Sequence, residues 1–405
     1  MQTIPNGSVT SPQGFLAGAA YAGLKTAAEG QRDVGILFSE APCCIAGVFT
    51  TNKFRAPPVH WCQERVAQGQ AQALVVNSGN ANAGTGVGTG QQGYRNTAQM
   101  AALAADVLGL TARDVLVAST GVIGVPLPMH KLHEGIKSIH LSRESGHEFV
   151  RAIITTDTFP KEIAVAVSLA GGRGVIGGAA KGAGMIHPNM ATMLSFVTTD
   201  LAVEPGFLQR ALRTAADLSF NMITVDGDTS TNDTLLVMAN GQAGNEPVRE
   251  GTPDAAAFQE ALNYVCIYLA KCVARDGEGA TKLIEVRVQG AASERDARLA
   301  ARTVAGSMLV KAAVYGNDPN WGRIAMAAGR SGAELEQEKV DIFIGDVCLM
   351  RDGQPQDYDT EAARLAIGQQ EVLLKLDLHL GSGKATAWGC DLTQEYVRLN
   401  AEYTT

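Results

Sequence analysis

Aliphatic and β-branched residues in the first half of the chain gather in short runs bounded by turn-forming residues. These runs occupy residues 33–39, 45–50 and 73–77. Runs of this length and composition are typical of β-strands. Between residues 94 and 108 the apolar positions recur every three or four residues, as at Met100, Ala104 and Leu108, which predicts a helix. An apolar run at residues 115–118 then predicts a buried strand.

The second half of the chain alternates between longer helical patterns and strands. Helical spacing predicts helices over residues 207–219, 255–274 and 294–313. Strand patterns cover residues 284–288, 339–349 and 373–380. A chain of 405 residues can bury a large core in two lobes. With no repeat or long linker, the pattern predicts an α+β architecture in which helices cover the faces of sheets.

A glycine-rich segment in the middle of the chain resembles a nucleotide site at first sight. Residues 172–177 match G-x-G-x-x-G, but a dinucleotide site needs a helix that opens at those glycines, and residues 178–184 would form a poor helix. A phosphate-binding loop also fails, because Ala180 and Gly182 flank Lys181 where glycine and Ser/Thr are required. We therefore expect a β-hairpin that presents Lys181, and we disfavour a nucleotide-dependent dehydrogenase.

The stretch from Lys181 to Leu194 reads KGAGMIHPNMATML and places one hydroxyl, that of Thr192, in an apolar run. It could be a loop that leads into a buried strand. Alternatively, the hydroxyl of Thr192 could attack the Ala191 carbonyl, shift the acyl group from nitrogen to oxygen, and let water release the upstream piece. Thr192 would then carry both a nucleophile and a free α-amine, whose pKa of about 7.7–8 suits a general base.

This stretch resembles the processing site of the ornithine acetyltransferase family, the glutamate N-acetyltransferases of arginine biosynthesis. Other motifs match that family in its order, at residues 119–124, 155–158, 276–282, 317–323 and 400–405. The resemblance implies cleavage between Ala191 and Thr192 into an α chain (residues 1–191) and a β chain (residues 192–405) that share one core. It also implies an α/β/β/α sandwich like that of N-terminal-nucleophile hydrolases, with different connectivity and a smaller C-terminal lobe.

The activity that the resemblance implies is a two-step exchange. The Thr192 hydroxyl takes an acetyl group from N2-acetylornithine, and glutamate then accepts it from the acetyl-threonine, a ping-pong order. Some members of the family also use acetyl-CoA as donor, and the motifs do not decide this for the present chain. Members assemble as α2β2 heterotetramers of their own two pieces, and the mechanism needs neither a metal nor a nucleotide cofactor.

The resemblance also assigns candidate site residues. Thr120 and Gly121, expected in a loop after a strand, would form the oxyanion hole with one hydroxyl and one N–H donor. Read alone, Ser-Thr-Gly is only a turn. The implied substrate-binding residues are Thr155, Lys181, Thr192, Glu278, Asn400 and Thr405.

Three of these assignments leave questions open. Lys181 suits a substrate carboxylate, whereas Glu278 could hold a substrate ammonium or tune protonation of the Thr192 amine. On a strand, Thr156 and Thr158 would share one face and Thr155 the other, and we choose Thr155. For the C-terminal residues to act, the tail must be docked on the protein.

Composition narrows the classes of function. The net charge of −8 argues against nucleic-acid binding. The seven cysteines are scattered without a C-x-x-C pair, which favours neither a disulfide framework nor a zinc site and fits a reducing compartment. His130 and His133 beside Glu134 lack the H-E-x-x-H spacing of a metal motif. The first residues do not resemble a signal peptide and no apolar run is long enough to cross a membrane, so we expect a cytoplasmic protein.

The sequence also permits two rival functions. An autoprocessed amidohydrolase or aminopeptidase would use the same nucleophile but admit water to the acyl-enzyme. A binding protein without chemistry would leave the bond before Thr192 intact. The matches at Lys181, Asn400 and Thr405 favour transfer between amino acids.

Overall fold

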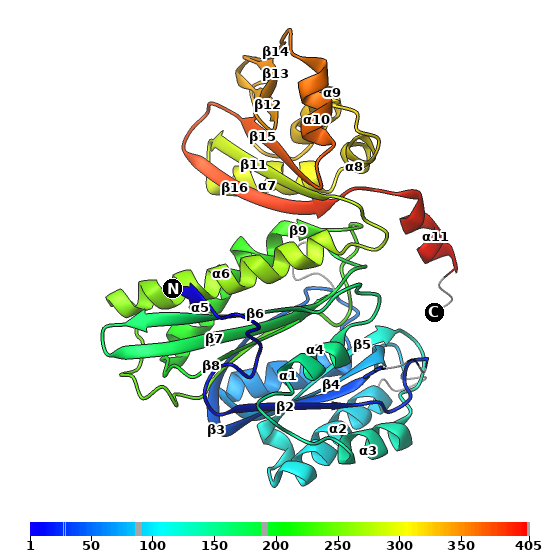
Figure 1. The fold of residues 1–405 in the computed structure, drawn as a ribbon, viewed down its shortest axis with the longest axis vertical. Helices are drawn as coiled ribbons and strands as arrows, with labels where there is room; N and C mark the ends of the chain where they lie inside the picture. Colours follow the sequence, from blue (N-terminus) through cyan, green and yellow to red (C-terminus); the bar gives the residue numbers. More distant parts are fainter. Residues whose placement is uncertain (27, 29, 86–90, 188–192, 403–405) are drawn as a thin grey trace.

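The computed structural model describes residues 1–26, 28, 30–85, 91–187 and 193–402. Figure 1 shows a larger lobe that contains both the blue and the green parts of the chain, and a smaller lobe that contains the yellow and orange parts. The chain returns from the smaller lobe through a last helix, α11 (Gln394–Glu402), which lies beside the larger lobe. No helix in the described ranges is long and apolar enough to span a membrane.

The larger lobe is built on a nine-stranded sheet. Its strands run in the order β1-β6-β7-β8-β10-β3-β4-β5, with β2 paired to β3. Their bounds are β1 Gln2–Thr3, β2 Phe15–Ala20, β3 Val34–Phe49, β4 Gln70–Asn80, β5 Val115–Val122, β6 Lys161–Leu169, β7 Gly172–Lys181, β8 Leu194–Thr199 and β10 Thr234–Ala239. β3 is 16 residues long, and it pairs with β2 through its first half and with β10 through its second half. The sheet is therefore divided by β3 into two parts that fold over one another (Figure 1).

The two parts of this sheet pack face to face, because alternate side chains of a strand point to opposite faces. Leu194 and Phe196 of β8 belong to the core that contains β2 to β5, whereas Val197 belongs to the core beneath α5 and α6. Phe149 and Phe196 are both fully buried at the inner face, with ring centroids 5.9 Å apart. Burying each ring contributes about 1.5–3 kcal/mol to folding.

Helices cover both outer faces of this pair of layers. The helices of the larger lobe are α1 Pro57–Gln68, α2 Gln91–Leu108, α3 Met129–Lys137, α4 Gly146–Ile153, α5 Pro205–Leu218 and α6 Pro253–Arg275. α1 and α2 pack on β4 and β5, α3 packs on α2 and β3, and α5 and α6 cover the opposite face. The expected α/β/β/α sandwich is confirmed. The expected helices at residues 94–108, 207–219 and 255–274 correspond to α2, α5 and α6.

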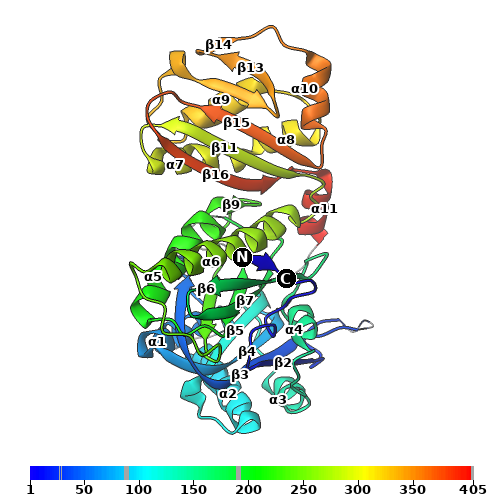
Figure 2. The ribbon, with the colours of Figure 1, turned by 60° about the vertical axis from the view of Figure 1, so that its left-hand side comes forward.

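The smaller lobe contains a seven-stranded sheet in the order β14-β13-β12-β15-β11-β16-β9. Its strands are β9 Ile223–Thr224, β11 Leu283–Ala291, β12 Asp341–Ile344, β13 Val347–Arg351, β14 Gln354–Pro355, β15 Glu371–Asp377 and β16 Gly383–Cys390. Its helices are α7 Glu294–Ala305, α8 Met308–Tyr315, α9 Trp321–Gly329 and α10 Thr360–Ile367. Short 3-10 turns occur at η1 Ala112–Asp114, η2 Phe220–Met222 and η3 Gln337–Lys339. β9 and α6 both contact β16 and so join the two lobes (Figure 2).

Two predicted elements of the smaller lobe are wrong in the same way. The single helix expected over residues 294–313 is broken between α7 and α8, where Gly306 ends one helix and Ser307 precedes the next. Glycine is a poor helix former and serine favours helix starts, so the break follows local preference although the apolar spacing continues across it. The strand expected over residues 339–349 is a hairpin of β12 and β13, which turns at Gly345 with φ +58°.

Candidate active site

A cavity of about 330 Å³ lies where the ends of β5 and β7 meet the loop after α6 and helix α11. Its walls include most of the residues that the sequence singles out: Thr120, Gly121, Thr155, Lys181, Glu278 and Asn400. The proposed nucleophile Thr192, the cleavage-site residue Ala191 and the substrate-binding candidate Thr405 lie outside the described residues. Residues from distant parts of the chain thus converge on one cavity.

Thr120 and Gly121 lie within β5, directly before its last residue Val122, and not in a loop as expected. β5 runs parallel to β4, and the register of the pair shifts at Gly79 and Asn80. Gly121 has φ +131°, and a Cβ there would lie 2.3 Å from the carbonyl carbon of Gly79. Only glycine fits this approach. The sequence therefore lets the strand end against its neighbour with Thr120 and Gly121 at the cavity wall.

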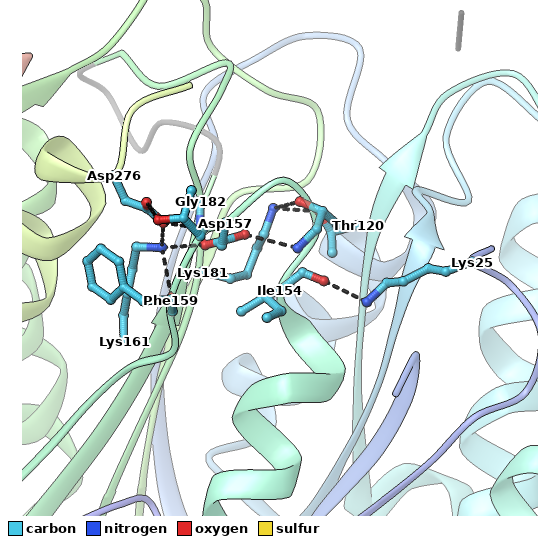
Figure 3. A network of polar contacts seen from close by, with 11 residues as sticks. Lys25, Thr120, Ile154, Asp157, Phe159, Lys161, Lys181, Gly182 and Asp276 are labelled. Carbon is cyan, nitrogen blue, oxygen red and sulfur yellow. Dashed lines mark hydrogen bonds and ion pairs between the residues drawn. The ribbon is translucent and has the colours of Figure 1, made fainter. Parts of the chain in front are cut away.

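Lys181 is the last residue of β7, which forms the expected hairpin with β6. Its Nζ lies 2.8 Å from the Thr155 hydroxyl and 3.3 Å from the Thr120 hydroxyl (Figure 3). Burial lowers the pKa of Lys181, and the carboxylate of Asp157 is the largest opposing influence. An ammonium has three N–H donors. Among the described residues, the hydroxyls of Thr155 and Thr120 use two of them, so one remains for a ligand.

The three threonines of residues 155–158 do not lie on a strand, so the expected alternation between them is wrong. They lie in the loop between α4 and β6. Thr155 accepts from Lys181, and Thr156 also lines the cavity. Thr158 faces away, since its N–H and its hydroxyl both donate to Asp276. The choice of Thr155 as a substrate contact stays a prediction.

Glu278 and Asn400 meet at the cavity wall. The Glu278 N–H donates to the Ala183 carbonyl at 2.9 Å, and its carboxylate lies against Gly184, where a Cβ would be 2.6 Å from Oε1. Asn400 on α11 donates from Nδ2 to Glu278 Oε2 at 2.9 Å. The tail as far as α11 is therefore docked on the site.

Sequence reasoning did not find a buried network of charges beneath the cavity. Lys161 Nζ lies 2.6 Å from Asp157 Oδ1 and 2.5 Å from Asp276 Oδ2 (Figure 3). Burial of the Asp157 carboxyl would raise its pKa, but Lys181, Lys161 and the hydrogen bonds from Gly182 and Lys161 together lower it to about 2. Both aspartates belong to motifs that the sequence showed. Lys161 carried no such signal, because its partner Asp276 is 115 residues away.

Asp233 is a second functional candidate that the sequence did not show. It is fully buried at the start of β10, and its Oδ1 accepts from the Met193 N–H at 3.0 Å. Its Oδ2 is buried and has no hydrogen-bond partner among the described residues. Burial raises the pKa of Asp233 well above its usual value, which favours the protonated acid at this position beside Met193.

The histidines do not add a further site. His187 Nδ1 lies 3.2 Å from the Thr224 hydroxyl, and burial lowers its pKa. His133 pairs with its neighbour Glu134 on α3. In the described ranges no group of three or more His, Cys, Asp or Glu side chains could hold a metal ion. All seven cysteines are free thiols.

Comparison with known proteins places this chain in a family. Residues 16–405 match the profile of the ArgJ family. The chain is 54% identical over 402 residues to the arginine biosynthesis bifunctional protein ArgJ of Dehalococcoides mccartyi, a match that covers 99% of this chain and 98% of that protein. The chain belongs to the ArgJ family.

Other ArgJ proteins show a similar degree of relationship. The arginine biosynthesis bifunctional protein ArgJ of Symbiobacterium thermophilum is 54% identical over 401 residues, covering 98% of this chain and 99% of that protein. The crystal structure of ArgJ from Bacillus halodurans aligns with a TM-score of 0.52 at 51% identity, covering 52% of this chain and all (100%) of that chain. The match to the ArgJ family therefore extends over nearly the whole sequence.

Proposed function

We propose that this ArgJ chain is a glutamate N-acetyltransferase that moves an acetyl group from N2-acetylornithine to glutamate in arginine biosynthesis. Its relatives are named for arginine biosynthesis. The observation that carries the proposal is one cavity that joins the Thr120-Gly121 pair with a cation, Lys181, and an acid, Glu278. Its volume of about 330 Å³ suits a ligand the size of an amino acid.

The chemistry begins with Thr192. Its hydroxyl attacks the acetyl carbonyl of the donor while its own α-amine takes the proton. The oxyanion receives hydrogen bonds from the Thr120 hydroxyl and the Gly121 N–H. When the intermediate collapses, the C–N bond breaks, ornithine leaves with the proton on its amine, and the acetyl group stays on Thr192 as an ester. The amine of glutamate then attacks this ester and leaves as N-acetylglutamate, which restores the Thr192 hydroxyl.

Substrate recognition divides between a cation and an acid that both line the cavity. Lys181, with Thr155 beside it, offers a cationic donor to the carboxylate that both amino acids carry. Glu278, which Asn400 contacts, also lines the cavity, and its carboxylate can hold a substrate ammonium or influence the Thr192 amine. Thr405 completes the proposed substrate contacts, as the family resemblance implies.

We also propose that the chain cuts itself between Ala191 and Thr192, because only an N-terminal threonine supplies the α-amine used above. The two pieces would remain associated. β8 and β10 of the downstream piece pair with β7 and β3 of the upstream piece, so the nine-stranded sheet requires both. Two copies of each piece would form the α2β2 heterotetramer that the resemblance implies.

An assay with isotope-labelled substrate tests this function. Purified protein is mixed with acetyl-labelled N2-acetylornithine and glutamate, and we expect labelled N-acetylglutamate by mass spectrometry. Without glutamate, the downstream piece should gain one acetyl group. Release of labelled acetate in place of N-acetylglutamate would support the amidohydrolase and overturn the transferase. Since the relatives are named bifunctional, acetyl-CoA is assayed as a second donor.

A further inference from the structure

Beneath the cavity, one buried ammonium lies between two carboxylates. Lys161 is fully buried on β6, and its Nζ contacts Asp157 at 2.6 Å and Asp276 at 2.5 Å. The side chains of Asp157 and Asp276 are 0% and 2% exposed. None of the three is among the residues that line the cavity. These residues can therefore affect a substrate only through the groups that they hold.

Asp157 is the residue of this network that reaches the cavity residues. Its Oδ1 accepts from Lys161 and from the Gly182 N–H, the latter at 2.7 Å. Its Oδ2 accepts from the Thr155 N–H at 2.9 Å. Gly182 adjoins Lys181 (Figure 3), and the Thr155 hydroxyl accepts from Lys181. One carboxylate thus fixes the backbone beside both members of the Lys181–Thr155 pair.

Asp276 connects the loop that carries Glu278 to the same network. It follows α6 and precedes Glu278 by two residues. Its Oδ2 accepts from Lys161 and from the Thr158 N–H, the latter at 2.9 Å. The Thr158 hydroxyl also donates to Asp276. Lys161 therefore ties the loop that carries Glu278 to the loop that carries Thr155.

A buried charge is costly unless it is paired, and removing one partner leaves the other uncompensated. The order Asp276, Lys161, Asp157, Lys181 alternates in sign, so each of the inner charges has an opposite neighbour. We propose that Asp157 is a positioning residue that sets both the place and the charge of the Lys181 ammonium. Lys161 and Asp276 hold Asp157 in place and tie the loop that carries Glu278 to it. This inference rests on the proposed function, in which Lys181 binds a substrate carboxylate.

The charge of Lys181 depends on every ionisable group that faces it. These groups are Asp157, Lys161, Glu278, Asp233 and Lys25. Burial lowers the pKa of Lys181 and the charge of Lys161 lowers it further, whereas the carboxyls raise it, Asp157 most strongly. Removing the Asp157 charge would let Lys181 lose its proton at a lower pH. Substrate binding, which needs the ammonium, would then weaken at a lower pH.

The test is Asp157→Asn, which removes the charge and one of the two acceptor oxygens while keeping the size. The matched control is Asp341→Asn, another buried carboxylate, which lies in the smaller lobe and accepts from the Asp352 N–H at 2.8 Å. We expect Asp157→Asn to raise KM for glutamate at least tenfold at neutral pH, with a smaller change in kcat. The alkaline limb of its kcat/KM profile should move about one pH unit or more to lower pH. Asp341→Asn should keep the parent's profile.

A double-mutant cycle separates positioning from general damage. If Asp157 acts through Lys181, the double variant Asp157→Asn/Lys181→Met should lose much less than the product of the two single losses. The inference would be overturned if the activity losses of the two single variants multiply in the double variant and the alkaline limb of the Asp157→Asn kcat/KM profile stays where it is in the parent. If Asp157→Asn fails to fold, Asp157→Glu is used. It keeps the charge, so the limb should stay while KM rises, and a parent-like KM would overturn the inference.

The two proposals can fail separately. If the parent protein makes no N-acetylglutamate, the proposed function is wrong and the role of Asp157 in it falls as well. If the parent is active and Asp157→Asn behaves like Asp341→Asn, only the present inference is wrong.

Discussion

The hydroxyl of Thr120 accepts a hydrogen bond from Lys181 at 3.3 Å, so its own proton remains available for donation. A donor whose oxygen already accepts from a cation is polarised and becomes a stronger donor. The Gly121 N–H follows it directly along the chain. The proposed oxyanion hole therefore consists of one side-chain donor coupled to Lys181 and one backbone donor that no side-chain substitution removes.

The first prediction concerns Thr120→Ala. Loss of one oxyanion donor lowers kcat by roughly 10²–10³-fold. KM should change little, because the lost interaction forms mainly in the transition state. The Gly121 N–H would sustain the residual activity. Steady-state kinetics with N2-acetylornithine on fully cleaved protein decide the matter, and a raised KM with an unchanged kcat would assign Thr120 to ordinary substrate binding.

The buried Asp233 should make the protein less stable as pH rises, which is the opposite of the effect of an ion-paired aspartate. Because burial raises its pKa, this carboxyl keeps its proton to a higher pH in the folded protein than in the unfolded chain, which releases it at about pH 3.9. The folded state thus binds more protons than the unfolded state above about pH 4, and the parent loses stability as pH rises from there towards the raised pKa of Asp233.

Asp233→Asn mimics the protonated acid and does not titrate. We expect its melting temperature, relative to that of the parent in the same cleavage state, to rise as pH increases from about 4 to neutrality. The relative gain is at most about 1.4 kcal/mol per pH unit. Thermal melts across this range provide the measurement. A variant that instead loses stability relative to the parent with rising pH would show that Asp233 is a charged, paired carboxylate.

At the scale of secondary structure, hydrophobic periodicity located most elements but not their interruptions. α5 and α6 bury one apolar stripe each, and that stripe is visible in the sequence. The break at Gly306 was missed because alanines and valines continue the stripe on both sides of it. Residues 155–158 were expected on a strand. In the structure their polar groups bind Asp276 and Lys181, and these partners cannot be inferred from local sequence.

The end of β5 depends on Gly121, which gives a prediction at this scale. In Gly121→Ala the new Cβ would lie 2.3 Å from Gly79, so the strand must move. Gly124→Ala is the matched control, because Gly124 also has a positive φ, +83°, but nothing lies within 4 Å of its Cβ position. We expect Gly121→Ala to lower the melting temperature and transfer activity far more than Gly124→Ala. Equal effects would show that backbone strain alone, and not the close approach to β4, explains the glycine.

At the scale of the whole molecule, the site is assembled from segments far apart in sequence. The motif residues Thr120, Lys181, Glu278 and Asn400 were recognisable one by one through a family resemblance, and the fold brings them to one cavity. The network that supports them was not recognisable, because the Lys161–Asp276 ion pair spans 115 positions and depends on how β6 meets the end of α6. Spacing along a chain predicts neighbours within an element and not across the core.

The pairing of β7 with β8 fixes the chain on both sides of the proposed cleavage bond. Lys181 pairs with Leu194 across β7 and β8, so the two ends of the segment that contains the proposed cleavage bond are fixed in one sheet. The Met193 N–H is held by Asp233, and the Met193 carbonyl accepts from the Thr234 N–H at 3.1 Å. A bond tethered at both ends can be cut without separating the pieces, because the sheet on either side remains hydrogen-bonded.

We therefore expect purified protein to contain two associated pieces, residues 1–191 and 192–405, and we expect Thr192→Ala to remain one chain. Alanine has no hydroxyl to accept the acyl group, so the nitrogen-to-oxygen shift cannot begin. Intact-mass measurement under denaturing conditions, with size-exclusion chromatography under native conditions, reports cleavage and association separately. Thr234→Ala, at the start of the neighbouring strand β10, serves as the control and should still be cut. Complete cleavage of Thr192→Ala at the same bond would show that an external protease does the cutting.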